Sequence, residues 1–417
     1  MDLILMTHRF PFDKGEEFLE KEVTYLSESF GKVVFIPSGE ISGKTIRPLP
    51  ANCTVFYPEK PFRATDPFSV QNIFEIIRVF FLTAKAEFRS TLKPLLKLPQ
   101  LKHVLKEIGY ALHWKNQIRR AVAENRLEKF QVYSYWLDSW LIAPILLRNE
   151  YPGLKIVSRV HGYDLYFERG FLGYQPFRPW LLKNLDGLYP VSQTGKIYLE
   201  RRFPGIGRLE TAYLGVEKQE VPNQPSTDGI LRVVSCAMMI PLKRIHLLIE
   251  ALGKLAIPVE WTHFGDGSLE ETLHIQAGKL PRNIRWTFAG NLRNSELMEY
   301  YRTHPVDVFV NTSETEGIPV TIMEAISFGI PAIGPDVGGV AEVVNDQYGF
   351  LLESDFSPET LAQKLYQLAQ METDEIEKRR NFARTFFLEN FYAGTNFPAF
   401  CQQISGEEKR QKNTVHH

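Results

Sequence analysis

The sequence has few of the features that mark a secreted, metal-binding or membrane-spanning chain. Its three cysteines lie far apart without C-x-x-C spacing, which argues against a disulfide framework and a zinc site and fits a reducing compartment. No apolar run approaches the ~18 residues that a spanning helix needs, and the first residues lack the basic region of a signal peptide. We therefore expect a cytoplasmic protein, or one held peripherally on the inner face of the cell membrane.

The chain also lacks an excess of charge of either sign. The formal net charge is −1 over 417 residues, so no global field attracts nucleic acid, and we expect no nucleic-acid partner. A hydrophobic content of 44% is that of an ordinary globular protein. The length exceeds what one compact core accommodates, which predicts two domains of roughly 200 residues each.

Short apolar strands alternate with longer helical segments along most of the chain. This alternation is typical of an α/β protein whose parallel sheets carry helices on both faces. Ligands of such sheets bind at the carboxyl ends of the strands, so the loops that follow strands are candidate sites. In the first half, strands are expected at 3–7, 33–38, 131–136, 155–162 and 187–192; in the second half, at 230–237, 259–267, 283–290, 307–313 and 331–339.

A polar segment at 213–229 contains prolines and glycines and separates the two strand-rich halves. It predicts a first domain at 1–215 and a second at 216–395. We expect the tail, 396–417, to pack back on the first domain.

The first domain carries a helical, basic insertion at about 70–128. Within it, segment 78–120 has ten basic residues and two carboxylates, a local charge of +8, with apolar residues interleaved. A basic amphipathic segment is typical of binding to an anionic membrane surface. A solvated helix face is an equally open interpretation.

Two carboxylates, Glu316 and Glu324, flank a short apolar run in "SETEGIPVTIME" (313–324). Glu316 follows an expected strand, where it could bind sugar hydroxyls, and Gly317 permits close approach of a ligand to the backbone. Glu324 falls in the second turn of the next helix, where it could accept hydrogen bonds from two vicinal hydroxyls. On spacing alone, a loop residue and a solvated helix carboxylate explain the pair equally well.

The helix within this stretch is expected to begin at about Pro319, a favoured first-turn residue. Its first backbone N–H groups, those of Val320, Thr321 and Ile322, would then lack helical acceptors. Together with the helix dipole they would form an anion site suited to a diphosphate.

The longer run from 313 to 344 resembles the retaining glycosyltransferases of family 4. It has their EX7E spacing between Glu316 and Glu324, then Gly-Ile-Pro at 329–331 and Gly-Gly-Val-Ala-Glu at 338–342. The resemblance implies the GT-B fold, with two Rossmann-like, doubly wound domains facing across a cleft. It also implies that Glu316 holds the donor sugar and that Glu324 holds the ribose of the nucleotide.

The segment 235–252 resembles the family's strand, loop and helix that carry an arginine and a lysine toward the donor diphosphate. Lys243 falls on the lysine position, whereas Met238 falls on the arginine position. Arg244 is the neighbouring cation that could replace the missing charge. A cation matters there because negative charge builds on the leaving diphosphate.

Two further family segments are matched. Gly265 lies in a Gly-Asp-Gly turn after a strand, which shapes the donor site in the family. His161 and Asp164 match its H-G-x-D segment, so the resemblance implies that His161 contacts the donor sugar near the reacting carbon and that Asp164 shapes the same pocket. A satisfied histidine at a strand end is the alternative for His161.

The loop after the first strand matches the family's glycine-rich acceptor loop less closely. Gly15 is the one glycine retained, and Glu17 is the expected glutamate. Aromatic residues at 133–140 fit either core packing, which the pattern favours, or sugar stacking.

These features predict a retaining, metal-independent glycosyltransferase without a cofactor other than its donor. We expect it to move a sugar from a nucleoside diphosphate donor, a UDP-sugar, to a glycan or lipid-linked glycan acceptor in bacterial surface polysaccharide synthesis. The first domain would bind the acceptor and the second the nucleotide-sugar. A GT-B epimerase or phosphorylase and a non-catalytic glycan-binding relative are the alternatives.

Overall fold

The computed structural model describes residues 1–417 except 13–14, 40–45, 58–73, 84–97, 171–172 and 407–417. The chain divides into two compact units. Unit 1 comprises 1–191, 195–212 and 397–417, and unit 2 comprises 192–194 and 213–396. The sequence predicted domain boundaries after 215 and after 395.

Unit 1 is built on a six-stranded, wholly parallel sheet with strand order β3-β2-β1-β4-β5-β6. The reversal of strand order between β1 and β4 is that of a doubly wound fold. The strands are β1 (Asp2–Thr7), β2 (Val33–Pro37), β3 (Cys53–Val55), β4 (Phe130–Ser134), β5 (Ile156–Val160) and β6 (Gly187–Pro190).

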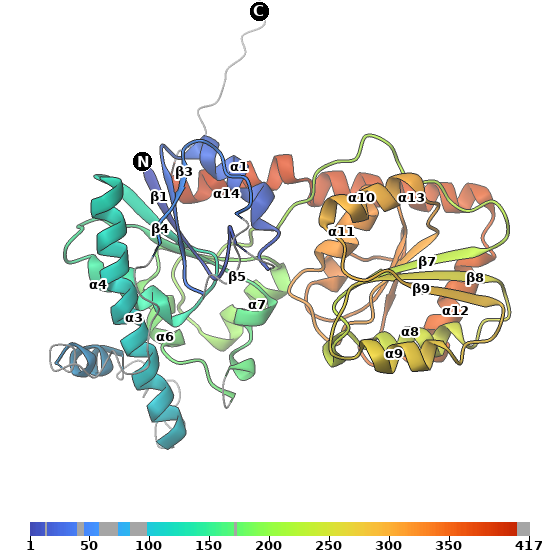
Figure 1. Ribbon diagram of the computed structural model, residues 1–417, viewed down its shortest axis with the longest axis horizontal. Coiled ribbons are helices and arrows are strands. Elements are labelled where there is room, and N and C mark those ends of the chain that lie inside the picture. Colours follow the sequence, from blue (N-terminus) through green and yellow to red (C-terminus); the bar gives the residue numbers. More distant parts are fainter. Residues whose placement is uncertain (13–14, 40–45, 58–73, 84–97, 171–172, 407–417) are drawn as a thin grey trace, which may run out of the picture. The chain divides into compact units, whose positions relative to one another are not determined.

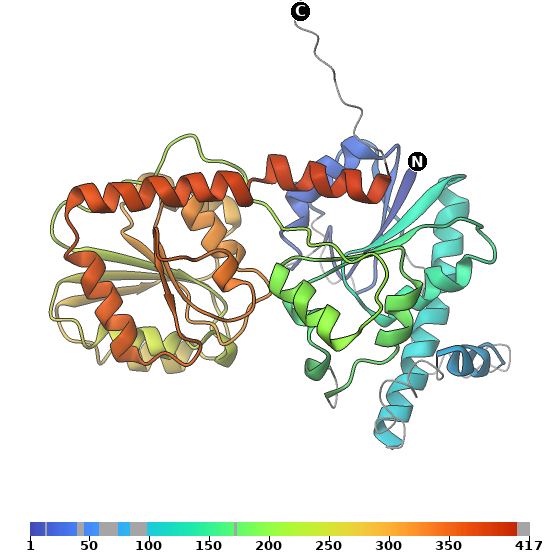
Figure 2. The same cartoon turned by 180° about the vertical axis from the view of Figure 1, so that it is seen from behind.

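Alternate residues of these strands supply two separate cores, one on each face of the sheet. Ile4 and Met6 belong to the larger core, which the helices α3, α4 and α6 complete, whereas Leu3 and Leu5 belong to a core shared with α1 and the unit 1 part of α14 (Figures 1 and 2). The helices with unit 1 residues are α1 (Leu19–Ser29), α3 (Leu98–Asn125), α4 (Ile142–Leu147), α5 (Gly162–Leu165), α6 (Arg178–Asn184), α7 (Gln193–Arg202) and α14 (Ala393–Ser405).

Unit 2 repeats this plan with strand order β12-β11-β10-β7-β8-β9, again wholly parallel. Helices α8, α9 and α12 lie on one side of the sheet and α10, α11 and α13 on the other (Figure 1). The strands are β7 (Leu231–Cys236), β8 (Val259–Phe264), β9 (Ile284–Phe288), β10 (Val308–Val310), β11 (Ala332–Pro335) and β12 (Phe350–Leu352); the helices are α8 (Ile245–Leu252), α9 (Glu270–Ala277), α10 (Asn294–Thr303), α11 (Val320–Ser327), α12 (Pro358–Ala369) and α13 (Thr373–Asn390).

The predicted fold class, α/β with two Rossmann-like doubly wound domains, is confirmed. The sequence did not predict the short strands β3 and β12, because three residues are too few to establish a period. It also assigned no helices after β12, where α12, α13 and α14 lie.

A buried ion pair joins three elements of unit 1. Arg159 on β5 is fully buried, and its Nε lies 3.3 Å from Oε2 of Glu22 on α1. Its guanidinium carbon lies 3.9 Å from the ring centroid of Phe400 on α14, and its Nη1 donates to the carbonyl of Ala212 at 2.5 Å. The hydroxyl of Tyr133 donates to Glu22 at 2.8 Å. This network fixes α1 and α14 against the same face of the sheet.

We expect Arg159→Ala to destabilise the chain by about 3–5 kcal/mol, because it leaves the Glu22 carboxylate buried without its cation. Calorimetric melting of the full chain should show a fall on the order of 10 °C. Arg208→Ala is the matched control: Arg208 pairs with Glu210 at the surface of unit 1, and its loss should cost about 1 kcal/mol or less. Equal shifts for the two variants would contradict the account.

Candidate functional site

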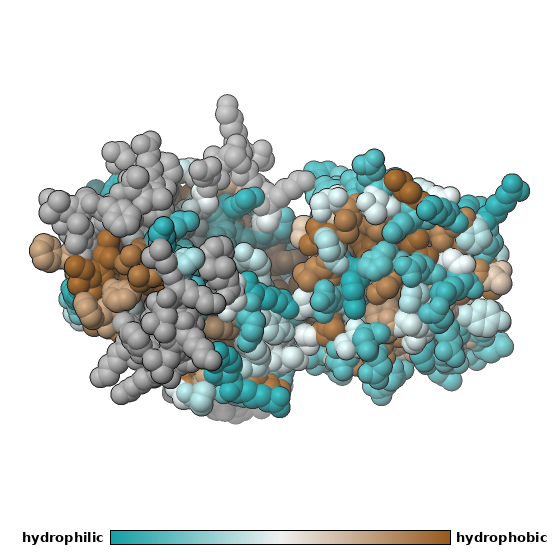
Figure 3. Space-filling view, turned by 90° about the horizontal axis from the view of Figure 1, so that it is seen from below, coloured by the Kyte–Doolittle hydropathy of each residue, from teal (hydrophilic) through white to brown (hydrophobic). Residues whose placement is uncertain are grey.

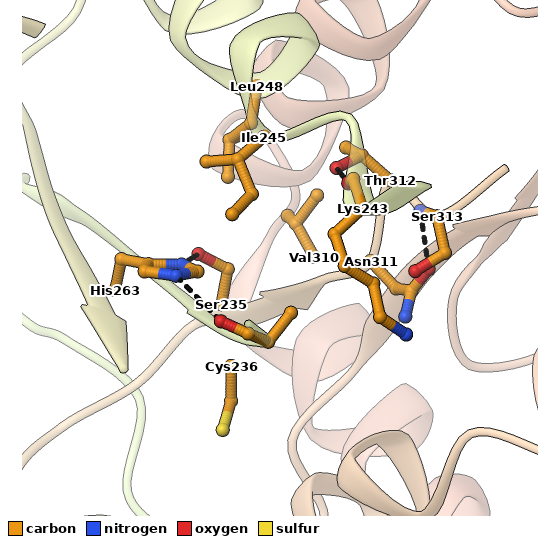
Figure 4. Close-up of a pocket in the computed structure, with 11 residues that line it drawn as sticks. Ser235, Cys236, Lys243, Ile245, Leu248, His263, Val310, Asn311, Thr312 and Ser313 are labelled. Atoms are coloured by element: carbon orange, nitrogen blue, oxygen red, sulfur yellow. Dashed lines mark hydrogen bonds between the residues drawn. The ribbon is translucent and has the colours of Figure 1, made fainter. Parts of the chain in front are cut away.

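The carboxyl edge of the unit 2 sheet brings together the loops after β7 and β10. Lys243, in the 3-10 turn Pro241–Lys243, donates from Nζ to Oε1 of Glu316 at 2.6 Å, and both side chains are largely buried. Glu316 also accepts from the hydroxyl of Ser313 at 2.6 Å and from Nδ2 of Asn311 at 3.3 Å. The carboxylate is therefore held in one orientation. Lys243 and Asn311 line the small cavity drawn in Figure 4.

Arg244 has a different environment from its neighbour. Its Nε donates to the carbonyl of Thr312 at 2.9 Å, and its Nη2 donates to those of Ser313 and Ser354 at 3.0 and 3.2 Å. Its guanidinium carbon lies 5.3 Å from the ring centroid of Phe356. In this structure Arg244 therefore ties two loops together through backbone oxygens. Its predicted role as a replacement for the missing arginine stays a prediction, and a donor would have to compete with these contacts.

Met238, at the position where the family has an arginine, is 58% exposed. No charge stands at that position, so among the residues singled out in this loop Lys243 is the cation that lines the cavity.

Helix α11 begins at Val320, with Pro319 as its N-cap residue. The N–H of Ile322 donates to the carbonyl of Pro319 at 3.0 Å, so the expectation that it lacks an acceptor is wrong. The helix thus begins one residue later than the sequence suggested. Val320 and Thr321 remain the candidate donors for an anion.

Glu324 lies in the second turn of α11 and is 5% exposed. Its Oε1 accepts from Nδ2 of Asn294 at 2.5 Å. Burial raises the pKa of this carboxyl to about 7, although the Asn294 amide lowers it. Keeping a carboxylate in such an environment costs stability, which is typical of a functional position rather than of a solvated helix face.

Close backbone packing explains three of the glycines at this edge. A Cβ on Gly338 would lie 1.9 Å from the carbonyl oxygen of Glu316, and one on Gly339 would lie 2.4 Å from that of Gly317. Gly265 has φ +138°, and a Cβ there would meet the carbonyl of Ala237 at 1.9 Å. These contacts pack neighbouring loops against one another and fix the backbone around Glu316 and Gly317.

A buried histidine that sequence reasoning missed also lines the cavity. His263 on β8 is hydrogen-bonded through Nδ1 to the hydroxyl of Ser235 at 2.8 Å and through Nε2 to the carbonyl of Ala237 at 3.1 Å (Figure 4). Burial lowers its pKa to about 4. Since a carbonyl can only accept, Nε2 carries the proton and Nδ1 accepts from Ser235. The sequence signal that could have found His263 is its place near the end of an expected strand.

Unit 1 places His161 directly after β5 with its imidazole buried. Neither ring nitrogen has a hydrogen-bond partner, and the ring lies 4.4 Å from that of Tyr135 and 4.7 Å from that of Trp136, centroid to centroid. Burial and the charge of Arg159 hold its pKa well below the ordinary value, so the ring is neutral. This is not the satisfied strand-end histidine of the alternative interpretation.

Asp164 shapes the backbone around His161. Its Oδ1 accepts from the His161 N–H at 2.6 Å and its Oδ2 from the Leu137 N–H at 2.7 Å. Burial raises its pKa to about 7. These contacts connect the loops that follow β4 and β5.

The loop after β1 is organised by Glu16 rather than by the Glu17 that the sequence suggested. The Glu16 carboxylate accepts the N–H groups of His8, Arg9 and Phe10 at 2.7–2.8 Å, and Nε1 of Trp136 at 2.6 Å. Two adjacent glutamates cannot be told apart by motif position alone.

Gly15 adopts φ +104°, which favours glycine, and its N–H donates to the Glu17 carboxylate at 2.6 Å. In the aromatic segment 133–140, Tyr133, Tyr135 and Trp140 are buried, so core packing accounts for these three rings.

The part of the chain that the structure describes contains no group of three or more histidine, cysteine or carboxylate side chains able to hold a metal ion. Within the same residues, no helix is long and apolar enough to cross a membrane.

The raised pKa of Glu324 predicts a pH-dependent loss of stability. Between the ordinary pKa of 4.5 and about 7, the unfolded chain ionises this carboxyl while the folded chain keeps it protonated, so stability falls as pH rises through this window. Glu324→Gln should therefore be more stable than the parent at pH 8, by up to about 3 kcal/mol, and similar to it at pH 4.

Thermal melting of the full chain at both pH values measures this difference. The exposed carboxylate Glu353 provides the matched control, Glu353→Gln, because the same substitution there removes a surface charge of the same unit. A gain for Glu324→Gln that is the same at both pH values would contradict a buried carboxyl with a raised pKa.

Comparison with known proteins agrees with this geometry. Residues 217–385, most of unit 2, match the sequence model of the family Glycosyl transferases group 1. The putative colanic acid biosynthesis glycosyltransferase WcaL of Escherichia coli (strain K12) is 26% identical over 234 residues, 53% of this chain and 57% of WcaL. The amylovoran biosynthesis glycosyltransferase AmsK of Erwinia amylovora is 26% identical over 249 residues, 55% of this chain and 60% of AmsK. The matches thus span somewhat over half the length of these relatives.

Solved structures match nearly the whole chain in fold. The lipopolysaccharide outer core galactosyltransferase WaaB in its apo form has a TM-score of 0.67 at 15% identity, covering 97% of this chain and 99% of WaaB. Anabaena HepE in complex with UDP has a TM-score of 0.63 at 15% identity, covering 98% of this chain and all of HepE (100%). Over residues 217–385 the chain is thus similar to the glycosyl transferases group 1 family.

Proposed function

We propose that this protein is a retaining glycosyltransferase that moves a sugar from a UDP-sugar to a glycan or lipid-linked glycan acceptor in the synthesis of a bacterial surface polysaccharide. The observation that carries the proposal is the Lys243–Glu316 ion pair at the strand edge that also holds the buried Glu324. The names of WcaL and AmsK support polysaccharide synthesis, and the complex of HepE with UDP supports the choice of nucleotide.

Each group at the unit 2 edge suits one part of such a donor. The Lys243 ammonium and the first N–H groups of α11, those of Val320 and Thr321, suit the diphosphate. The Glu324 carboxylate suits the two ribose hydroxyls, and Glu316 suits hydroxyls of the sugar. The loop packing around Gly317 leaves backbone rather than side chain beside the sugar.

In the proposed reaction the acceptor hydroxyl attacks the anomeric carbon on the face from which the diphosphate departs. The bond from the anomeric carbon to the phosphate oxygen breaks, and its electron pair stays with the UDP oxygen. The acceptor oxygen bonds to the same carbon, and its proton passes to the departing phosphate oxygen. Lys243 stabilises the negative charge that develops on UDP. This scheme uses no protein nucleophile, metal ion or cofactor beyond the donor.

Unit 1 is the proposed acceptor domain. His161 is buried, neutral and without a partner at either ring nitrogen. A buried polar group in that state gains most from a hydrogen bond that a ligand supplies. We propose that a sugar hydroxyl supplies it, with Asp164 keeping the His161 backbone in place.

Substitutions at Lys243 and Glu316 should separate the two parts of the donor site. Lys243→Ala should weaken UDP binding by about 10–100-fold, because it removes a charge-assisted hydrogen bond to phosphate. Glu316→Gln should not weaken UDP binding, because it releases Lys243 from its ion pair. It should nevertheless lower the rate of sugar transfer by about 100-fold or more, because the partner of Glu316 is the sugar. Calorimetric titration with UDP and a UDP-release assay measure these two effects.

Lys254→Ala is the matched control, since Lys254 forms a surface pair with Glu359 in the same unit. Unchanged UDP affinity in Lys243→Ala would contradict the donor-site assignment. Release of sugar phosphate or an epimerised donor without an acceptor would favour a phosphorylase or an epimerase. UDP-sugar binding without any turnover would favour a non-catalytic relative.

A second proposed partner is an anionic membrane surface, which unit 1 would contact from the cytoplasmic side. The helical segment 74–83 exposes Phe74, Ile77, Arg78, Phe81 and Leu82, a stripe at helical spacing with Phe74 78% and Phe81 69% exposed. Hydrophobic side chains gather on the unit 1 part of the surface in Figure 3. An exposed apolar stripe with a cation in it fits a bilayer interface.

The charge of the predicted insertion supports this partner only in part. Lys115, Arg119 and Arg120 form ion pairs with Glu75, Glu150 and Glu124 respectively, so they add little free charge. Lys102 and Lys106 are exposed on α3. The remaining basic residues at 85–97 lie outside the described residues.

Flotation of the full chain with vesicles containing anionic phosphatidylglycerol tests the membrane proposal. The double variant Phe74→Ser, Phe81→Ser should lose at least about 90% of the binding, because it removes two exposed rings whose burial in the bilayer would contribute roughly 1.5–3 kcal/mol each. Tyr366→Ser, an exposed aromatic of unit 2, is the control and should bind as the parent does. Equal flotation of the double variant and the parent would exclude this stripe as the contact.

A further inference from the structure

One face of the unit 2 sheet is left open at its β8–β9 edge. Sheet register places Glu260 beside Arg232 and Arg285, and Thr262 beside Thr287, in two adjacent rows on that face. Strands of a parallel sheet covered on both faces are normally apolar throughout. The polar rows here lie at a rim of the face where α10 contacts Thr262 through Tyr300 but Arg285 and Thr287 stay exposed. On the opposite face Val259, Trp261 and Ile284 are buried in the core.

A cavity of about 300 Å³ lies over these rows. Tyr300 of α10 forms one wall: its hydroxyl donates to Oγ1 of Thr262 at 3.3 Å, and its ring stacks on that of His304 at 4.3 Å and 8°. Among the residues that line the cavity are Arg232, Glu260, Thr262, Arg285, Thr287 and Tyr300.

The charges beneath the cavity cancel one another. Arg232 donates through both terminal nitrogens to Asp228, at 2.8 and 2.6 Å, and its Nε lies 3.0 Å from Glu260. Arg285 pairs with the same Glu260. Two guanidinium groups thus meet two carboxylates. The Glu260 carboxylate would repel an anionic ligand such as a phosphate, and the two arginines would repel a cation. A neutral ligand therefore fits the cavity best.

The cavity is separate from the candidate donor site. Arg232, Glu260 and Arg285 are each the second residue of their strand, at the amino end, whereas Lys243 and Glu316 follow strands at the carboxyl end of the same sheet. A nucleotide held at one edge therefore leaves the other accessible.

We propose that this cavity is a second binding site of unit 2, for a neutral oligosaccharide. Stacked aromatic rings offer an apolar surface for the C–H face of a sugar ring, and paired guanidinium, carboxylate and threonine groups offer both donors and acceptors for its hydroxyls. A concave site with a few fixed polar groups is the usual form of a small-ligand site. The choice of a glycan rests on the proposed function, for which the second site would retain a growing or acceptor chain.

Saturation-transfer NMR on the full chain tests this site with neutral hexasaccharides of glucose, galactose and mannose, in the presence of saturating UDP. At least one hexasaccharide should show saturation transfer from the protein, and the effect should be strongest at its ring C–H protons. Thr287→Trp, which fills the cavity from an exposed position, and Tyr300→Ala should each weaken its binding at least tenfold. Tyr366→Ala, an exposed aromatic on α12, should bind as the parent does.

The proposal would be overturned if none of the hexasaccharides shows saturation transfer, or if Thr287→Trp leaves hexasaccharide binding unchanged. The outcome is independent of turnover, because a binding signal needs no donor sugar. If hexasaccharide binding is seen without any glycosyl transfer, the second site stands and the proposed reaction fails. If Thr287→Trp abolishes hexasaccharide binding yet releases UDP at the parent rate with a short acceptor, both proposals are supported.

Discussion

The ion pair between Lys243 and Glu316 is the contact on which the candidate donor site of unit 2 depends. It links the loop after β7 to the loop after β10, and Ser313 and Asn311 hold the same carboxylate from the β10 side. The parallel sheet makes this possible, because strands that run the same way end at one edge and their loops meet there. Arg244 adds a second connection through backbone carbonyls. Each charge of the pair is thus neutralised by the other, and a diphosphate would have to take Lys243 over from Glu316.

Buried polar groups in both units are held at a cost in stability. Glu324 and Asp164 have pKa values raised to about 7 by burial, and His161 has neither ring nitrogen bonded. Packing alone would favour apolar side chains at such positions. A ligand that brings hydroxyls to these groups would satisfy them, which is the physical link between the cost of burying these groups and the proposed recognition of sugars.

The fold class could be predicted from the sequence, because it follows from the lengths of the strands and helices and from their alternation. The positions of Glu316 after a strand and of Glu324 on the next helix could also be predicted, because they depend only on local structure. The errors arise where the outcome depends on tertiary contact. Ile322 bonds within the first turn of α11. Glu16 and not Glu17 organises the β1 loop, because only the former reaches three backbone N–H groups. The open face at β8 and β9 could not be predicted from the sequence either, since it depends on how the helices pack over the sheet.

The central claim is that unit 2 binds a nucleoside diphosphate at its carboxyl strand edge, and thermal melting of the full chain with added UDP tests it most directly. Binding to the folded state alone should stabilise the chain by about 2.7 kcal/mol at a UDP concentration of 100 times Kd. This predicts a rise of several degrees that grows with the logarithm of UDP concentration and is smaller with UMP, which lacks the second phosphate. A melting temperature that does not change up to millimolar UDP would contradict the account.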